Sequence, residues 1–479
     1  MSELPHPLTL ARGHAETTAL IGRPVSTSWR QFGDRAARLT EQLILAGVGD
    51  REPVAVVAEA EENFPLLLGG LLGAQAVAVM LSPRFPDVEL ARTARQSGCR
   101  FQLIASRKPR RLAGLRTINV DFDDLALRRP YCDNPPILSD GQPITTLFTS
   151  GSSGTRKAVT LTYGNHYYSA QGSNENLPLT PGDRWLLSLP LFHVGGLGIF
   201  FRCLLAGATM VHVDRETALA AQIVRDRVTH LSLVPTQLRR LLRDPGVKEA
   251  AGRLKAILLG GGPIPTQLVQ EARSMGLPVY PTYGMTEAAS QVATTSEAHP
   301  DCMKALNYRE LRVSDGGEIV VGGQTIAPGV SVSGWYHTGD VGKLDDDGCL
   351  TVLGRSDAMF ISGGENIHPE TIELALAAID GIVEALVVPV EDTEFGSRPV
   401  AFLKCDDNVS LSNSDSELSE ESRFGLDHRS LDAALEETLP RFMIPIEYLT
   451  WPREYRPAGL KADREFLASL AAKLLSSRG

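Results

Sequence analysis

The sequence of 479 residues lacks the features that mark membrane, secreted and nucleic-acid-binding proteins. No charge-free apolar run reaches the roughly 20 residues that a transmembrane helix needs. The first residues, Met1 to Pro5, do not combine a basic segment with an apolar one as a secretory signal does, so we expect a cytoplasmic location without stable membrane insertion. The net charge of −10 gives no overall attraction for nucleic acid or for an acidic membrane surface.

Cysteine is also scarce. The six cysteines are Cys99, Cys132, Cys203, Cys302, Cys349 and Cys405. No two are close in sequence, which argues against both a disulfide framework and a zinc site. We therefore expect reduced, structural cysteines and small molecules as binding partners. The sequence leaves the oligomeric state open, a homodimer or a larger assembly included.

What is present predicts an α/β fold in two domains, because a chain of this length is too long for one hydrophobic core. Strand-like runs and helical stretches alternate, with strands at 54–57, 185–189, 209–213, 230–234 and 255–259 and helices at 28–47, 216–227 and 264–275. After about residue 310, short strands with Asp-Gly turns indicate a small β subdomain.

A smaller α+β unit is expected at the C-terminal end, with a helix at 369–379, strands at 383–389 and 399–404 and a helix at 431–438. We place the boundary at Asp357, between a large N-terminal domain (1–356) and a smaller C-terminal domain (357–479). Residues 407–423 are rich in Ser, Asp and Glu without apolar periodicity, which predicts a surface loop. A phosphorylated or partner-binding segment is the alternative.

One segment has the composition of a phosphate-binding loop. It consists of Thr149, Ser150, Gly151, Ser152, Ser153, Gly154, Thr155, Arg156 and Lys157. The glycines let backbone N–H groups converge on an anion, the hydroxyls donate hydrogen bonds, and Lys157 adds a positive charge. The segment departs from the Walker pattern, because Arg156 precedes the lysine where a glycine should. Taken alone, it could equally be a flexible linker.

Two glycine-containing turns follow predicted strands, where open α/β sheets hold ligands. Gly260-Gly-Gly-Pro263 comes after the strand at 255–259, and Tyr283-Gly-Met-Thr-Glu287 comes about twenty residues later. Glycines permit the close approach of a base, Tyr283 could stack on it, and Glu287 could hold Mg²⁺ through oxygen. Ordinary turns are the other interpretation of either segment.

A third cluster contains Tyr336-His-Thr-Gly-Asp340, Gly354-Arg-Ser-Asp357 and Ser362-Gly-Gly-Glu-Asn-Ile367. The Asp340 carboxylate could accept hydrogen bonds from two ribose hydroxyls, and Arg355 could add donors to the same nucleotide. A surface ion pair between the two is the alternative.

In this order, the three clusters resemble the adenylate-forming superfamily of acyl-CoA synthetases, nonribosomal adenylation domains and luciferases. The resemblance covers most of the chain. It implies a large N-terminal domain, a mobile C-terminal domain and an active site between them. There, ATP and Mg²⁺ would activate a carboxylic acid as its adenylate, and coenzyme A would take the acyl group as cosubstrate.

The resemblance also implies roles for individual residues. Thr149 to Lys157 would grip the β- and γ-phosphates, and Gly261, Gly262 and Tyr283 would form the adenine site. Thr286 would contact the α-phosphate, Glu287 would bind Mg²⁺, and Asp340 and Arg355 would bind ribose. Asp357 would be the hinge, and Gly363 and Gly364 would line a channel for the pantetheine arm.

The catalytic lysine of the superfamily is assigned to Lys461, in Ala458-Gly-Leu-Lys461-Ala-Asp-Arg464. The superfamily has this lysine directly after the glycine, so it is displaced here by one residue, although its spacing to Arg464 is kept. A solvated surface lysine is the alternative. The phosphate loop departs from the superfamily as well, with Ser153 for the usual Thr, Arg156 for Pro and Ala158 for Gly.

Within the superfamily, several segments look most like the o-succinylbenzoate:CoA ligases of menaquinone synthesis. They are Leu189-Pro-Leu-Phe-His-Val-Gly-Gly196, Tyr283 to Gln291, Glu394-Phe-Gly-Ser-Arg-Pro-Val400 and the Gly-Leu-Lys461 ending. This implies that His193 gates the acyl and thiol sites and that Ser290 and Gln291 line the acid pocket. Structural roles for all three are the alternative.

Arg202 interrupts an apolar helical run where an unpaired charge is costly to bury, so it is expected to need an anionic partner. The resemblance to the o-succinylbenzoate:CoA ligases implies that this partner is the acid's second carboxylate. An arginine that reaches solvent or pairs with a nearby carboxylate is the alternative. For the whole chain, the alternatives are a CoA ligase for another aryl or medium-chain acid, a stand-alone adenylation enzyme that loads a carrier protein, and a catalytically silent nucleotide-binding protein.

Overall fold

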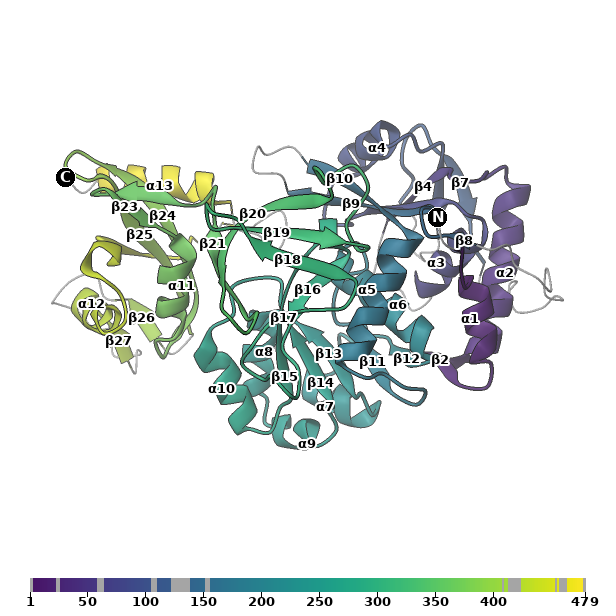
Figure 1. The fold of residues 1–479 in the computed structure, drawn as a ribbon, viewed down its shortest axis with the longest axis horizontal. Coiled ribbons are helices and arrows are strands. Elements are labelled where there is room, and N and C mark those ends of the chain that lie inside the picture. The colour runs from purple at the N-terminus through teal and green to yellow at the C-terminus, as the bar shows by residue number, and fades with distance from the viewer. Residues whose placement is uncertain are drawn as a thin grey trace.

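The computed structural model describes residues 3–22, 26–57, 64–104, 110–121, 138–150, 156–406, 409–411, 424–452, 455 and 463–476. Figure 1 shows a large body built from the N-terminal three quarters of these residues and a small unit at its side that contains the C-terminal helices. None of the helices in these ranges has the length and hydropathy that a bilayer crossing needs.

Two large sheets form the body. The six-stranded sheet has the order β10 (Arg156–Thr162), β9 (Pro143–Ser150), β5 (Val77–Leu81), β4 (Pro53–Val57), β6 (Phe101–Ile104) and β7 (Arg116–Asn119). The nine-stranded sheet has the order β17 (Lys304–Ala305), β16 (Ser290–Thr294), β15 (Val279–Met285), β14 (Ala256–Leu259), β13 (His230–Leu233), β11 (Arg184–Leu186), β12 (Thr209–Val211), β2 (Thr18–Ile21) and β3 (Ser26–Ser28).

Helices cover both faces of these sheets. They are α1 (Pro7–Gly13), α2 (Trp29–Leu45), α3 (Phe64–Gly73), α4 (Asp87–Gln96), α5 (Tyr163–Asn176), α6 (Val194–Ala206), α7 (Leu219–Arg225), α8 (Pro235–Leu242), α9 (Val247–Ala251) and α10 (Thr266–Ser274). Local signals set where they begin: the Ser28 hydroxyl accepts from the Gln31 amide at the start of α2, and Thr162 caps α5 in the same way through Asn165.

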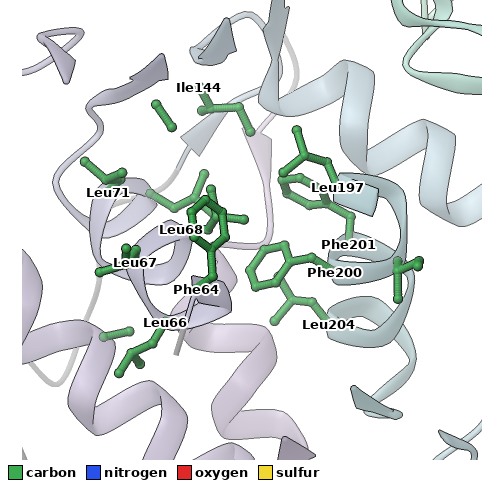
Figure 2. Packing of buried hydrophobic residues seen from close by; sticks show 14 of the residues in the cluster. Phe64, Leu66, Leu67, Leu68, Leu71, Ile144, Leu197, Phe200, Phe201 and Leu204 are labelled. Atoms are coloured by element: carbon green, nitrogen blue, oxygen red, sulfur yellow. The ribbon is translucent and has the colours of Figure 1, made fainter. Parts of the chain in front are cut away.

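The largest hydrophobic core lies between the two sheets, where α3 and α6 meet. Leu197, Phe200, Phe201 and Leu204 recur at helical spacing on one face of α6 and are fully buried. Figure 2 shows Phe200 and Leu204 pointing toward Phe64 and its neighbours on α3. The same core contains Val54 of the six-stranded sheet and Met210 of the nine-stranded one, so a single hydrophobic layer joins the two sheets.

A four-stranded antiparallel sheet follows, with the order β18 (Arg309–Val313), β19 (Glu318–Gly323), β20 (Trp335–Leu344) and β21 (Leu350–Arg355). It confirms the small β subdomain expected after residue 310. Next along the chain is the hairpin of β22 (Phe360–Ser362) and β23 (Glu365–Ile367), which turns at Gly363 and Gly364; both have positive φ, as a two-residue hairpin turn requires.

The C-terminal unit contains a three-stranded sheet and three helices. Its elements are α11 (Pro369–Ala377), β24 (Ile382–Asp392), β25 (Gly396–Cys405), α12 (His428–Glu436), β28 (Glu447–Thr450) and α13 (Arg464–Ser476). Its two hydrophobic clusters draw on residues from Phe360 onward, whereas the clusters of the body end at Val352. The division at Asp357 into separately moving domains stays a prediction.

Two expectations from the sequence were wrong. Cys302 and Cys349 form a disulfide, with Cα atoms 5.0 Å apart, because Met303 and Leu350 pair as an isolated bridge and bring the two cysteines together from 47 residues apart. The segment 407–423, expected to be a surface loop, contains β26 (Val409–Leu411), which pairs in parallel with β27 (Phe424–Leu426). Residues 412–423 between them lie outside the described part of the chain.

Candidate functional site

The carboxyl ends of β14 and β15 form the floor of the candidate nucleotide site. The two strands are parallel neighbours, with Leu259 opposite Pro281, so the loops that follow them meet at one edge of the sheet. At Gly260 a side chain would lie 2.8 Å from Cγ2 of Thr282, and Gly261 has a φ of +82°. A side chain at Gly262 would meet nothing within 4 Å, so the predicted adenine loop faces open space.

Three predicted nucleotide residues form one hydrogen-bonded group beside this loop. The Tyr283 hydroxyl donates to Oδ2 of Asp340 at 2.6 Å, and Nη1 of Arg355 lies 3.3 Å from Oδ1 of the same carboxylate. Asp340 and Arg355 face each other across β20 and β21. Burial, followed by the charge of Asp340, raises the pKa of Tyr283, so this hydroxyl stays a donor at neutral pH.

Arg355 also connects the site to the predicted hinge. Its Nε and Nη2 donate to the two carboxylate oxygens of Asp357 at 2.9 and 2.7 Å, and its Nη1 donates to the Thr338 carbonyl at 2.7 Å. The hydrogen bond to Asp357 is the largest cause of the raised pKa of Arg355. In this conformation the Arg355 guanidinium donates to both Asp340 and Asp357. The ion pair between Asp340 and Arg355, which was the alternative interpretation of the sequence, is therefore one part of a larger group of contacts.

Glu287 lies in the turn between β15 and β16, in the short helix η2 (Thr286–Ala288), and is 9% exposed. Its carboxylate is near Tyr336, whose pKa is raised by burial and then by Glu287. A buried carboxylate in this turn fits Mg²⁺, which prefers oxygen ligands and shares its coordination with water and phosphate. No group of three His, Cys, Asp or Glu suited to a metal occurs among the described residues, so a protein-only metal cage is absent from that part.

The phosphate loop is described only at its two stems. Thr149 on β9 is directly opposite Lys157 on β10, and Lys157 is exposed. Strand β10 contacts η2, so the lysine belongs to the strand that adjoins Thr286 and Glu287. The predicted residues between the stems, Gly151 to Thr155, lie outside the described residues, as does Lys461.

Arg202 is buried in α6, with 1% of its surface exposed. Its guanidinium lies over the Trp185 ring at 5.2 Å, and Nη2 donates to the Ser290 hydroxyl at 3.3 Å. It forms no ion pair with a carboxylate anywhere in the described ranges, and its buried Nε has no hydrogen-bond partner there. Burial lowers the pKa of Arg202 to about 10, so it is still charged at pH 7.

Gly198 makes room for this guanidinium, because a side chain at that position would lie 3.0 Å from Nη2. Arg202 therefore does not reach solvent, and within the described part it does not pair with a carboxylate, which removes the two structural alternatives that the sequence left open there. A buried, fixed cation with an unused donor is suited to bind an anionic group of a ligand.

Of the three residues predicted around the acid, Ser290 has a hydrogen bond to this cation, whereas none joins His193 or Gln291 to it among the described residues. His193 is the residue that precedes α6, its Nε2 is buried without a partner in the described part, and burial lowers its pKa to about 4. Ser290 contacts Arg202 directly. The Gln291 amide nitrogen donates to the Thr294 hydroxyl at 2.9 Å, whereas its Oε1 has no partner in the same described ranges.

The remaining predicted residues lie in the C-terminal unit. Gly363 and Gly364 turn the β22–β23 hairpin, and the Gly363 amide donates to the Phe395 carbonyl at 2.9 Å. Figure 1 places β23 in the small unit, apart from β15 and β16. Arg464, at the start of α13, donates to Glu373 at 2.6 and 3.0 Å and to Glu370 at 3.2 Å, which anchors the residues just after Lys461.

Sequence reasoning missed Arg309 and Ser169, which contact the backbone around Ser290. No motif marks either residue. Tyr336 begins the segment Tyr336-His-Thr-Gly-Asp340, but the sequence predicts no role for it. Its position near Glu287 depends on the fold.

Comparison with known proteins agrees with this geometry. A family model described as AMP-binding enzyme matches residues 9–330. Among curated relatives, the 2-succinylbenzoate–CoA ligase of Escherichia coli (strain K12) is 33% identical over 468 residues, which cover 94% of this chain and 95% of that protein.

Two solved structures of o-succinylbenzoate CoA synthetase from Bacillus subtilis are similar over nearly the whole chain. The complex with the acyl-adenylate intermediate OSB-AMP gives a TM-score of 0.82 at 30% identity and covers 98% of each chain. The complex with ATP and a magnesium ion gives a TM-score of 0.81 at 29% identity and covers 97% of this chain and 99% of that one.

Proposed function

Because the chain belongs to the AMP-binding enzyme family, we propose that it is an ATP-dependent o-succinylbenzoate:CoA ligase. It converts ATP, o-succinylbenzoate and coenzyme A into o-succinylbenzoyl-CoA, AMP and pyrophosphate. The observation that carries the choice of acid is Arg202, a buried cation without a carboxylate partner among the described residues. Its contact, Ser290, comes three residues after Glu287 in the same β15–β16 hairpin, so the acid and nucleotide sites adjoin.

The first half-reaction activates the acid. A carboxylate oxygen attacks the α-phosphorus of ATP, an acyl-adenylate forms, and pyrophosphate departs. Asp340 and Arg355 orient the ribose, Thr286 contacts the α-phosphate, and Lys157 with the rest of the 149–157 loop neutralises the departing phosphates. Glu287 would hold Mg²⁺, which adds positive charge to the pyrophosphate. Lys461 bridges the developing charges, so catalysis rests on positioning and electrostatics rather than on a protein nucleophile.

The second half-reaction moves the acyl group to a thiol. The thiol of coenzyme A loses its proton to water, its sulfur attacks the acyl carbon to form the thioester, and AMP leaves with the electron pair of the broken C–O bond. For this step the C-terminal domain rotates about Asp357, withdraws Lys461 and brings the Gly363–Gly364 turn to the pantetheine channel. His193, neutral at pH 7, separates the acyl and thiol sites.

The test is thioester formation and pyrophosphate release with o-succinylbenzoate, benzoate and a plain fatty acid. We expect o-succinylbenzoyl-CoA with a kcat/KM at least about tenfold above that for either monocarboxylic acid, because only the dicarboxylic acid pairs with Arg202. The Lys461→Ala variant is the negative control for adenylation. Preference for a monocarboxylic acid would replace this proposal with one of the other acids.

We also propose a cytoplasmic location, where ATP and coenzyme A are available. The Cys302–Cys349 disulfide argues in the other direction, because structural disulfides are rare in reducing compartments. Alkylation of free thiols in intact cells, followed by mass spectrometry of the two cysteines, decides between the compartments. Extensive alkylation of both supports the cytoplasm.

A further inference from the structure

The backbone at the start of β16 has an unusual conformation. Ala289 has a φ of +52° and Ser290 a φ of +103°, a region in which residues other than glycine are strained. Position 284, which pairs with Gln291 on the neighbouring strand, requires glycine, because a side chain there would collide with the Ser290 carbonyl oxygen. Such strain persists only where the surroundings hold the backbone firmly. Ser290 is also the residue whose hydroxyl meets Arg202.

Arg309, the first residue of β18, holds this bend from both sides. Its Nε donates to the Gln291 carbonyl at 2.8 Å, just after the bend. Its Nη2 donates to the Ser169 hydroxyl at 3.0 Å, and that hydroxyl donates to the Ala289 carbonyl at 2.5 Å, just before the bend. The carbonyl groups on either side of Ser290 are therefore both tied to one guanidinium.

The space for Arg309 is specific to this side chain. Arg309 is 6% exposed, and a side chain at Gly172 on α5 would lie 2.5 Å from its Nη1. Within the described ranges its partners are carbonyl and hydroxyl oxygens, without an ion pair to a carboxylate. The nearby Glu175 carboxylate accepts instead from Asn307 and Tyr308.

Among the described residues, the charge of Glu175 therefore offsets that of Arg309 only in part. Burial, and next the charge of Arg202, lowers the pKa of Arg309 to about 9. Two buried guanidinium groups thus influence each other across the Ser290–Gln291 backbone. An anionic ligand near Arg202 would relieve part of this repulsion.

We propose that Arg309 is a positioning residue of the acid site: through Gln291, Ser169 and Ala289 it fixes the strained bend that presents Ser290 beside Arg202, and so sets the preference for an acid with two carboxylates. This inference rests on the proposed function. Arg309 does not itself touch the acid. It acts through the backbone and through its positive charge.

The test compares the variants Arg309→Met, Arg309→Lys and Ser169→Ala with wild type. Each is assayed with o-succinylbenzoate and with 4-oxo-4-phenylbutanoate, which lacks the ring carboxylate. Arg312→Met is the matched control, because Arg312 lies on the same strand but is exposed and stacks on Trp335. KM for ATP is measured for every variant.

For Arg309→Met we expect KM for o-succinylbenzoate to rise about tenfold or more, while kcat and KM for ATP change by less than about threefold. The preference for the dicarboxylic acid, as a ratio of kcat/KM values, falls by a similar factor. Arg309→Lys recovers part of it, since the charge is kept without the fork of donors. Ser169→Ala gives a smaller loss in the same direction, and the control has no effect.

Equal losses for both acids, with the preference unchanged, would show a purely structural role and overturn the proposal. If both Arg309 variants fail to fold, Ser169→Ala decides alone by the same ratio. The wild-type result is independent: absence of thioester from o-succinylbenzoate overturns the proposed function, whereas a wild type that makes it and variants that keep its preference overturn only the role of Arg309.

Discussion

Among single residues, Arg202 shows how burial limits the roles that a side chain can have. A guanidinium with 1% exposure has lost its hydration, and its aromatic neighbour and one serine hydroxyl replace only part of it. Under the proposed function, the cost of this arrangement would be recovered when the second carboxylate of the acid binds. The free protein is therefore prepared for its ligand at the expense of its own stability.

From this follows a prediction for Arg202→Leu. We expect KM for o-succinylbenzoate to rise by a factor that corresponds to about 2 kcal/mol or more, because the second carboxylate would be buried without a partner. KM for ATP stays unchanged, since Asp340 and Arg355 are intact. Steady-state kinetics with both acids measure this. A variant that still prefers the dicarboxylic acid shows that another group selects it.

Among the structural elements, the junction between β21 and β22 is where the predicted hinge of the C-terminal unit lies. Arg355 ends β21 and holds Asp357 through two hydrogen bonds. Two further contacts join the body to the C-terminal unit: Arg239 of α8 donates to the Ala377 carbonyl at 3.0 Å, and Arg243, the residue after α8, forms an ion pair with Asp406. A rotation about Asp357 would have to break the latter two contacts. Both contacts are polar, as is typical of an interface between domains that move relative to each other.

For Asp357→Pro we expect adenylation to be retained and thioester formation from a supplied acyl-adenylate to fall strongly. Proline fixes φ near −65° and restricts Ser356 as well, so the rotation is blocked. Because this variant also removes the carboxylate that binds Arg355, Asp357→Ala is the control: it loses the same hydrogen bonds but keeps the backbone free. Normal thioester formation in the proline variant would contradict the hinge assignment.

For the whole molecule, four buried histidines predict how stability depends on pH. Burial lowers the pKa values of His6, His193 and His230 to about 4 and that of His166 to about 3, from 6.5. Between these values the unfolded chain binds more protons than the folded one, so stability falls as pH decreases from about 7 toward 4. Each histidine contributes a loss of about 1–2 kcal/mol at pH 5.

The measurement is Tm between pH 7.5 and pH 5, for wild type and for His166→Gln. Removing one neutral buried histidine should make the decrease of Tm with falling pH shallower, even though the loss of the Thr145 contact and of the stacking on Phe201 lowers Tm at every pH. Parallel curves for the two proteins would mean that His166 does not contribute to the acid sensitivity.

Much of this molecule was predictable because its signals are local. The strands at 54–57 and 255–259 are predicted within one residue of β4 and β14, and the segments Gly260–Pro263 and Tyr283–Glu287 are predicted at strand ends, as the parallel pairing of β14 and β15 confirms. Hydrophobic runs and glycines encode these features directly. The burial of Arg202 could also be inferred, since it interrupts an apolar helical face.

Other features depend on contacts between segments far apart in the sequence. The bond between Cys302 and Cys349 requires that Met303 and Leu350 pair, and neither spacing nor composition indicates that. Arg309 donates to backbone carbonyl groups of α5 and β16. Every residue type has a backbone carbonyl, so the sequence does not indicate which residues will be its partners. The positive φ of Ala289 and Ser290 likewise contradicts the local preference of both residues.

The Cys302–Cys349 disulfide has a consequence for limited proteolysis. It closes β18, β19 and β20 in a covalent ring, and the exposed segment 328–334, with Val332 at 69% exposure, lies inside that ring. Exposed loop tips are the preferred sites of nicking. A cut there by proteinase K should leave two fragments that migrate together on a non-reducing gel and separate once dithiothreitol is added. Fragments that separate without reductant would show that the two thiols are free.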